Sequence, residues 1–284
     1  MDFKNITIIG VGLIGGSLAL ALKKKGYKGR ITGVGRNKKN LNSAREAGII
    51  DDCSTVHSQG VKYADLVIIA ASVGQFEEIA KKINTHLKKG AIVTDVGSVK
   101  SRIINIIEPL MPEDVFFVGG HPIAGKECSG LEGATPDLFH NARCIITPSA
   151  NTKRAAMNKV KSLWKMVGMK TVIMTPEEHD QVFAAVSHMP HIVAYTIVNS
   201  ILDADRKFMR YGGRGLKDIT RIAMSSEELW RDICSSNRED ILSTLRKFSS
   251  SVSRMIKMFE KSDWKGLEGE FKRAREARKL IESD

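Results

Sequence analysis

Three glycines near the start of the chain, Gly10, Gly12 and Gly15, have the GxGxxG spacing. They follow an apolar, β-branched run and open a helix-forming segment. In such a unit the first glycine allows a tight turn, the second a close approach of the backbone to a pyrophosphate, and the third close packing of helix on strand. The amides of Leu13 and Ile14 would face the phosphate charge. The spacing predicts a dinucleotide-binding site, with a purely structural glycine turn as the alternative.

The end of the second predicted strand indicates which dinucleotide would bind. Sites for NAD usually place Asp or Glu about 20 residues after the glycines, where the carboxylate accepts hydrogen bonds from the ribose hydroxyls. Residues 33–39 offer no carboxylate and three cations, Arg36, Lys38 and Lys39. A guanidinium pairs well with a 2′-phosphate, so Arg36 favours NADP over NAD. The alternative is a solvated basic loop beside a pocket that accepts either cofactor.

Two polar segments follow later predicted strands, DVGSVK at residues 95–100 and GGHPIAG at residues 119–125. Ligands of open α/β sheets bind outside the carboxyl ends of the strands, so we expect both segments beside a bound nicotinamide. His121 is the candidate general base, because an imidazole titrates near neutral pH and a hydride leaves a carbinol carbon only as the hydroxyl proton is removed. A histidine that only caps the loop before Pro122 is the alternative.

The elements that must position these residues form an alternating pattern in the first part of the chain. Short β-branched runs alternate with amphipathic stretches, which is typical of a parallel sheet with crossover helices. The predicted strands are residues 6–9, 31–34, 66–70, 92–95, 115–118, 144–147 and 172–174. The pattern predicts an α/β fold, a doubly wound and mostly parallel Rossmann-type sheet, as a dinucleotide-binding domain over residues 1–174.

The pattern changes after residue 174, and no strand-like run follows. Thr175, Pro176 and Glu178 form a capping box with a first-turn proline, so a long helix should start there, and Pro190 should kink it. A heptad-like seam of apolar residues follows at Ile241, Leu245, Phe248, Val252, Met255 and Phe259. We expect an all-helical domain over residues 175–284 that binds substrate and carries either a helical bundle or a dimer interface.

The composition of the 284-residue chain is that of an ordinary globular protein with a formal net charge of +12. The basic residues are scattered and lack interleaved aromatic residues, so we expect a small anionic ligand and no nucleic acid. No apolar run is long enough to span a membrane and no secretory signal precedes the first strand, so no membrane partner is expected. The four cysteines lack metal-ligand spacing, which indicates a cytoplasmic protein without a metal.

Together the motifs resemble the prephenate dehydrogenase family, including its arogenate-using members. The resemblance rests on five segments that occur in the same order over more than three-quarters of the chain. They are the glycine motif, DVGSVK, GGHPIAGKE at residues 119–127, SHMPH at residues 187–191, and GGRGLKDITRIA at residues 212–223 followed by WRD at residues 230–232.

The resemblance implies an NAD(P)-dependent oxidative decarboxylation of prephenate to 4-hydroxyphenylpyruvate in tyrosine biosynthesis, or of arogenate to tyrosine. His121 would match the residue that deprotonates the ring hydroxyl, and Ser98 the serine that orients this hydroxyl near the nicotinamide. Arg221 would match a carboxylate-binding arginine, with Asp218 in the same segment. The alternative for Arg221 and Asp218 is a surface ion pair.

Four further residues follow from the resemblance. His191 would match a second active-site histidine that contacts the substrate side chain, and Glu127 an acidic residue near the entrance. Trp230 resembles an aromatic that reaches the cleft from the same or a partner subunit, with core packing as its alternative. Lys126 stands where members of the family often carry threonine, and its charge would repel the ammonium group of arogenate, which favours prephenate.

Two other functions stay open, beside the expected homodimeric dehydrogenase. One is a different two-domain dehydrogenase that acts on a β-hydroxyacid, although such enzymes commonly use a lysine where this chain offers His121. The other is a regulatory protein that senses a dinucleotide and catalyses nothing, in which loss of His121 would leave function intact.

Overall fold

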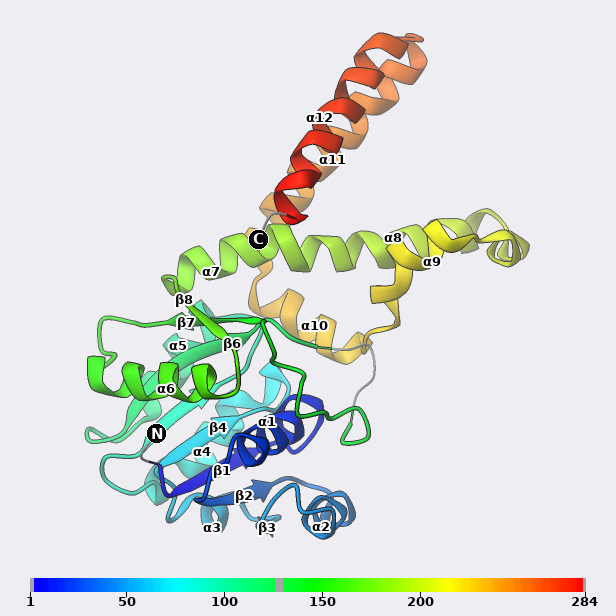
Figure 1. The fold of residues 1–284 in the computed structure, drawn as a ribbon. Helices are drawn as coiled ribbons and strands as arrows, with labels where there is room; N and C mark the ends of the chain where they lie inside the picture. The colour runs from blue at the N-terminus through cyan, green and yellow to red at the C-terminus, as the bar shows by residue number, and fades with distance from the viewer. Residues whose placement is uncertain (1–2, 126–129, 283–284) are drawn as a thin grey trace. The chain divides into compact units, whose positions relative to one another are not determined.

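The structure is a computed structural model that describes residues 3–125 and 130–282 (Figure 1). Its eight strands form one sheet in the order β3-β2-β1-β4-β5-β6-β7-β8. The strands are β1 (Asn5–Ile9), β2 (Arg30–Val34), β3 (Asp52–Ser54), β4 (Leu66–Ile69), β5 (Ile92–Asp95), β6 (Phe116–Pro122), β7 (Arg143–Thr147) and β8 (Lys170–Ile173). Because β1 to β6 pair in parallel and β7 pairs with β6 in the antiparallel sense, the prediction of a mostly parallel, doubly wound sheet is confirmed.

Helices cover both faces of this sheet and bury its central strands, whereas the edge strands β3 and β8 are only partly buried. The helices are α1 (Leu13–Lys24), α2 (Lys38–Glu46), α3 (His57–Val61), α4 (Phe76–Ile83), α5 (Ser101–Ile107), α6 (Arg154–Met166), α7 (Pro176–Phe183), α8 (Met189–Ala204), α9 (Arg214–Thr220), α10 (Glu227–Ser236), α11 (Arg238–Glu260) and α12 (Trp264–Glu282). Helices α1, α2 and α6 pack in one apolar cluster with Ile6 and Ile8 of β1, whereas α3, α4, α5 and α10 pack in a second with Ile9. Both faces of a parallel sheet are normally covered in this way, which explains the continuous apolar runs.

The sixth strand is longer than the sequence predicts. We expected a strand over residues 115–118 and a loop at His121, but β6 continues to Pro122 and pairs His121 with Ile145 of β7. The glycines there do not mark a loop. A Cβ on Gly119 would lie 2.4 Å from Thr147 Oγ1, and one on Gly120 would lie 2.9 Å from the Asp95 carbonyl oxygen, so glycine lets the neighbouring strands approach. The short polar strand β3 was not predicted either.

Helices α7 and α8 form one helical stretch that a π-helical turn, Ala184–His188, interrupts. Thr175 caps this stretch as predicted, since its side chain accepts a hydrogen bond from the Glu178 amide. We expected a kink at Pro190, and the structure has this π-helical turn directly before it, where the missing proline amide removes a hydrogen bond of the regular helix. By length and composition the stretch could cross a membrane, but it carries the buried polar residues His179, Asp180 and His188.

By its internal contacts the chain divides into two compact units, Met1–Arg238 and Glu239–Asp284. Every described residue after β8 that lies in regular structure is helical, as the sequence predicts. In the second unit Arg254 of α11 forms an ion pair with Glu270 of α12, and Phe259 contacts Trp264 edge to face. The predicted boundary between a dinucleotide-binding domain and a substrate-binding domain, after residue 174, stays a prediction.

Candidate functional site

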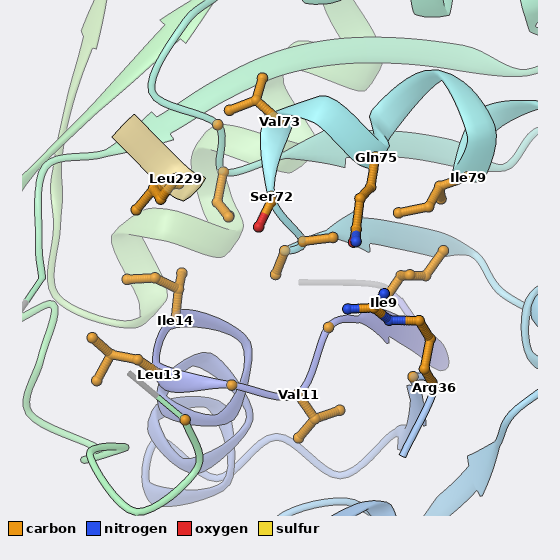
Figure 2. Close-up of a pocket in the computed structure, with 18 of the residues that line it drawn as sticks. Ile9, Val11, Leu13, Ile14, Arg36, Ser72, Val73, Gln75, Ile79 and Leu229 are labelled. Atoms are coloured by element: carbon orange, nitrogen blue, oxygen red, sulfur yellow. The ribbon is translucent and has the colours of Figure 1, made fainter. Parts of the chain in front are cut away.

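A cavity of about 750 Å³ lies at the carboxyl ends of the parallel strands (Figure 2). Its wall includes the segments that follow β1, β2, β4 and β5, and Leu229 of α10 lies on its rim. The strand order reverses between β1 and β4, and an open α/β sheet binds its ligand at such a switch point. The cavity is therefore the place where a dinucleotide would bind.

The three glycines of the first turn each meet a different requirement of this cavity. Gly10 has a φ of +98°, and a Cβ there would lie 2.3 Å from the Ala70 carbonyl oxygen. A Cβ on Gly15 would lie 2.1 Å from the Gly10 carbonyl oxygen, so Gly15 allows α1 to pack on β1. A Cβ on Gly12 would meet no atom within 4 Å. Gly12 therefore leaves room for a ligand and not for protein, as the motif predicts.

The amino end of α1 suits a phosphate group. Gly12 caps this 12-residue helix without a side-chain hydrogen bond, and its first turn holds no acidic residue. Leu13 and Ile14 line the cavity. Unpaired amides at a helix amino end attract an anion, so the geometry fits the pyrophosphate of a dinucleotide.

Cationic and polar side chains line the cavity beside β2 and α4. They are Arg36, Asn37, Asn40, His57 and Lys82. In Figure 2 the guanidinium of Arg36 points into the cavity opposite Gln75. Lys82 lies 2.6 Å from the Glu78 carboxylate, which also lines the cavity. The predicted Arg36 thus lies where an adenosine ribose would be expected, together with a second cation, Lys82, that the sequence did not single out.

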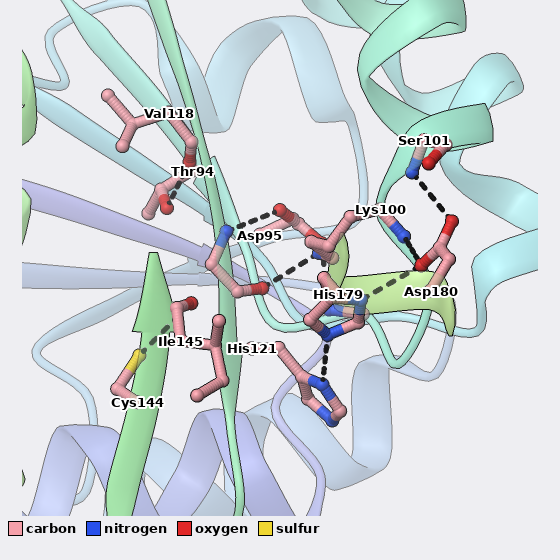
Figure 3. Close-up of polar contacts among 12 residues, drawn as sticks. Thr94, Asp95, Lys100, Ser101, Val118, His121, Cys144, Ile145, His179 and Asp180 are labelled. Atoms are coloured by element: carbon pink, nitrogen blue, oxygen red, sulfur yellow. Dashed lines mark hydrogen bonds and ion pairs between the residues drawn. The ribbon is translucent and has the colours of Figure 1, made fainter. Parts of the chain in front are cut away.

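The DVGSVK segment is anchored by a buried ion pair. Lys100 and Asp95 are both fully buried and their side chains are paired. Lys100 Nζ also donates to the Gly120 carbonyl oxygen at 2.8 Å, and the Gly120 amide donates to Asp95 Oδ1 at 3.0 Å (Figure 3). This network joins the end of β5 to the residue before His121. Ser98, between the two anchors, lines the cavity as predicted.

His121 lies in β6 and is 9% exposed. Its Nδ1 lies 2.8 Å from Nε2 of His179 in α7 (Figure 3). Burial lowers the pKa of His121 well below its ordinary value, and the charges of His179, Lys100 and His188 lower it further. A neutral imidazole can accept a proton. His121 does not belong to the wall of the dinucleotide cavity, whereas Ser98 does.

Behind His179 lies the carboxylate of Asp180, which is 3% exposed. The His179 Nδ1 to Asp180 Oδ1 distance is 2.8 Å. Asp180 also accepts the amides of Lys100 and Ser101 at 2.7 and 2.8 Å. Burial raises the pKa of Asp180, but the hydrogen bonds from His179, Ser101 and Lys100 more than offset this effect, so the pKa lies below its ordinary value. Asp180 is therefore a carboxylate that joins α7 to the start of α5.

The SHMPH segment contributes two histidines with different surroundings. His188 is fully buried, and its Nδ1 lies 3.2 Å from the side-chain amide nitrogen of Asn237, which also donates to the Asp180 carbonyl oxygen at 2.8 Å. Burial lowers the pKa of His188 to about 4, against the opposing effects of Asp180 and the Ser98 backbone. His191 instead stacks on Trp230, with ring centroids 3.7 Å apart. His191 and Trp230, each named from the resemblance, thus lie in contact, and Trp230 is buried in the apolar cluster around α10.

Two of the remaining predicted substrate residues, Arg221 and Asp218, lie on the surface of the chain. Arg221 begins the 3₁₀ turn Arg221–Met224, Asp218 lies in α9, and both side chains are exposed in this single chain. Lys126 and Glu127 lie outside the described residues. Within the described part of the chain no group of three or more His, Cys, Asp or Glu side chains could hold a metal ion.

The sequence missed His179, Asp180, Lys100 and Asn237. A signal for the first two was present, because adjacent histidine and aspartate residues follow the Thr175 capping box by one turn. Lys100 carried a weaker signal, a lysine at the end of an otherwise small and apolar segment. Nothing in the sequence pairs Asn237 with His188, because these residues are 49 positions apart.

Comparison with known families matches both parts of the chain. The family model described as prephenate dehydrogenase, nucleotide-binding domain, matches residues 18–174. The model described as prephenate dehydrogenase, dimerization domain, matches residues 175–273.

Individual relatives cover nearly the whole chain. Prephenate dehydrogenase of Bacillus subtilis (strain 168) is 37% identical over 280 residues, which are 96% of this chain and 75% of the relative. The crystal structure of prephenate dehydrogenase from A. aeolicus in complex with hydroxyphenyl propionate and NAD+ has a TM-score of 0.93 and 35% identity, covering 99% of both chains. The structure of Synechocystis arogenate dehydrogenase has a TM-score of 0.82 and 27% identity, covering 98% of this chain and 99% of that chain.

Proposed function

Because the chain belongs to the prephenate dehydrogenase family, we propose that it catalyses the NAD(P)-dependent oxidative decarboxylation of prephenate to 4-hydroxyphenylpyruvate. The observation that carries this proposal is the cavity at the strand ends, which fits a dinucleotide and has Ser98 in its wall. The family match of both halves of the chain supplies the reaction class. A regulatory protein that only senses a dinucleotide has no specific observation in its favour.

The bound dinucleotide would supply the hydride acceptor. Within the chain, His121 accepts the proton of the ring hydroxyl, because its buried imidazole is neutral at neutral pH. Ser98 orients that hydroxyl from the end of β5. Loss of hydride from the hydroxyl-bearing carbon lets the ring carboxylate leave as carbon dioxide, and the ring becomes aromatic. The resulting phenolate oxygen takes the proton back from His121, so the reaction needs no metal and no net proton transfer to the protein.

The substrate carries two carboxylates and therefore needs cations. Arg221 holds one carboxylate, with Asp218 orienting this arginine, and Lys126 and Glu127 set the polarity near the entrance. His191, held against Trp230, contacts the substrate side chain. We favour prephenate over arogenate because a lysine at position 126 repels an ammonium group. The similarity to an arogenate dehydrogenase keeps arogenate as the second candidate substrate.

For the cofactor, NADP is the preferred form in this proposal and NAD the alternative. Arg36 and Lys82 line the cavity beside β2, where a 2′-phosphate would lie. Arg36→Ala should weaken NADP binding about 10- to 100-fold and NAD binding less than about 3-fold, as the loss of a charge-assisted contact requires. Lys39→Ala, which removes a nearby cation in the first turn of α2 that does not line the cavity, is the matched control. Equal losses for both cofactors would contradict the preference.

We further propose that the enzyme acts as a homodimer in the cytoplasm, with residues 1–174 binding the dinucleotide and residues 175–284 binding substrate and forming the dimer contacts. The name of the second family model supports the dimer. Free cysteines at Cys53, Cys144 and Cys234 fit a reducing compartment.

One assay tests the proposed function. The purified protein is mixed with prephenate or arogenate and with NAD or NADP, while formation of the reduced cofactor and of 4-hydroxyphenylpyruvate or tyrosine is followed. We expect the highest kcat/KM with prephenate and NADP. Absence of turnover in all four mixtures, from a folded protein that binds a dinucleotide, would overturn the proposed function.

A further inference from the structure

His121 is the first member of a buried chain of three polar side chains. Its Nδ1 is 2.8 Å from His179 Nε2, and His179 Nδ1 is 2.8 Å from Asp180 Oδ1. His179 is fully buried, and its ring stacks on Phe183 with centroids 4.4 Å apart. Phe183 also lies against His121, at 4.9 Å. This hydrogen-bonded series is therefore buried away from solvent, where each hydrogen bond has a strong influence on its neighbours.

The proton positions on His121 and His179 follow from the charge of Asp180. Asp180 is ionised and already accepts two backbone amides, so it can only accept from His179. His179 Nδ1 must then carry a proton. A neutral His179 has its lone pair on Nε2, which makes this atom the acceptor for His121. The proton of neutral His121 is consequently on Nδ1, and its lone pair is on Nε2.

We propose that His179 and Asp180 are positioning residues for the reaction. They hold His121 in the tautomer whose Nε2 can accept the substrate proton, and they stabilise the imidazolium that then forms on His121. This inference rests on the proposed function of His121. When the hydroxyl O–H bond breaks, the proton joins Nε2, and Nδ1–H remains directed at His179. The positive charge is then stabilised through His179 by the Asp180 carboxylate. The same proton returns to the phenolate oxygen after carbon dioxide leaves.

The charges around His121 and His179 are consistent with this positioning role. Burial lowers the pKa of His179, and Lys100 from the start of α5 opposes its protonation, whereas Asp180 and Asp95 favour it. His188 from the π-helical turn and Lys100 both act against a charge on His121. His179 therefore stays neutral, as the hydrogen-bond order requires. A doubly protonated His179 would donate to His121 Nδ1 and leave the base protonated at Nε2, in the inactive tautomer.

The test compares two substitutions of His179 with a distant control. His179→Phe keeps the ring that stacks on Phe183 but removes both nitrogen atoms. It should lower kcat roughly 10- to 100-fold, change KM less than about 3-fold, and shift the acid limb of the pH profile of kcat to lower pH, because the imidazolium of His121 loses its partner. His179→Gln keeps an acceptor for His121 and should recover part of kcat, with the limb still displaced. His140→Gln, at an exposed histidine, should match the wild type in every readout.

A second readout does not depend on turnover. In protein labelled with ¹⁵N-histidine, the His121 resonances, assigned from a His121→Asn sample, should show Nδ1 protonated and Nε2 unprotonated at neutral pH. His179→Phe should abolish this preference. If the protein has no activity on prephenate, the proposed function fails, but the tautomer is still measured.

Two results would overturn the inference. One is a His121 protonated at Nε2 in the wild type. The other is a folded His179→Phe protein with wild-type kcat and an unchanged pH profile. If His179→Phe does not fold, the same two criteria apply to His179→Gln.

Discussion

Buried imidazoles are concentrated around one carboxylate in this protein. His121, His179 and His188 are all nearly or fully buried, and burial lowers the pKa of each. A buried neutral histidine binds its proton less readily in the folded state than in the unfolded state. The contribution of these histidines to the stability of the folded protein is therefore complete above the unfolded pKa of about 6.5, and it is lost as the pH falls toward the folded value.

The loss of stability at low pH can be measured for His188. With a folded pKa of about 4, its contribution to the free energy of unfolding should fall on the order of 2 kcal/mol between pH 7.5 and pH 5. The midpoint of thermal unfolding, measured at both pH values, should drop less in His188→Asn than in the wild type, while His140→Gln should drop as much as the wild type. An equal drop in all three proteins would contradict the burial of a neutral His188.

At the residue scale, the sequence predicted the residues whose signal is local. Gly10, Gly12 and Gly15 act through their own backbone, and Arg36 follows a strand at a known distance. His179 and Asp180 could not be assigned in this way, because their importance comes from a contact 58 residues away, between α7 and β6. A contact across such a separation depends on how a helix packs against the sheet, which the local pattern does not contain.

At the scale of helices and strands, the turn between β1 and α1 contains two glycines that should respond differently to alanine. Gly12→Ala places a methyl group in the space reserved for ligand, so its thermal midpoint should stay within about 2 °C of the wild type while dinucleotide affinity falls at least about 10-fold. Gly15→Ala places a methyl group against backbone, so it should destabilise the fold by about 1–3 kcal/mol. Thermal unfolding and dinucleotide titration of both variants check this contrast. A destabilised Gly12→Ala that binds normally would contradict the assignment.

The boundaries of some helices and strands depend on contacts between residues that are distant in sequence. Alternation and β-branched runs were sufficient to find seven of the strands, because parallel strands are buried on both faces. The extension of β6 to His121 was missed because its glycines serve the close approach of β5 and β7, a property of neighbours that are distant in sequence. Pro190 was predicted to kink the helix, but the π-helical turn that precedes it and holds His188 was not, because its form depends on tertiary contacts.

At the scale of the whole molecule, the second unit exposes apolar side chains that one chain does not cover. Phe248, Val252, Ile256 and Phe259 of α11 are each more than a third exposed, and all of them except Ile256 belong to the predicted heptad seam. Contiguous exposed apolar surface on a helix indicates a protein interface. The matched dimerization-domain model extends over α11.

The proposed dimer can be tested on this helix. The double variant Phe248→Glu, Val252→Glu places charges on the seam and should shift the protein from dimer to monomer in sedimentation velocity. Lys247→Glu, a charge change on a polar neighbour, should leave the dimer intact. A double variant that sediments as the wild-type dimer would show that α11 is not the interface.

His121 is proposed to remove a proton from the substrate while hydride passes to the bound dinucleotide. This step can be measured as single-turnover formation of reduced cofactor from prephenate, for the wild type and for His121→Asn. Loss of a general base predicts a rate lower by roughly 10² to 10⁴, with dinucleotide affinity changed less than about 3-fold. A folded His121→Asn protein that reduces the cofactor at the wild-type rate would contradict this role of His121.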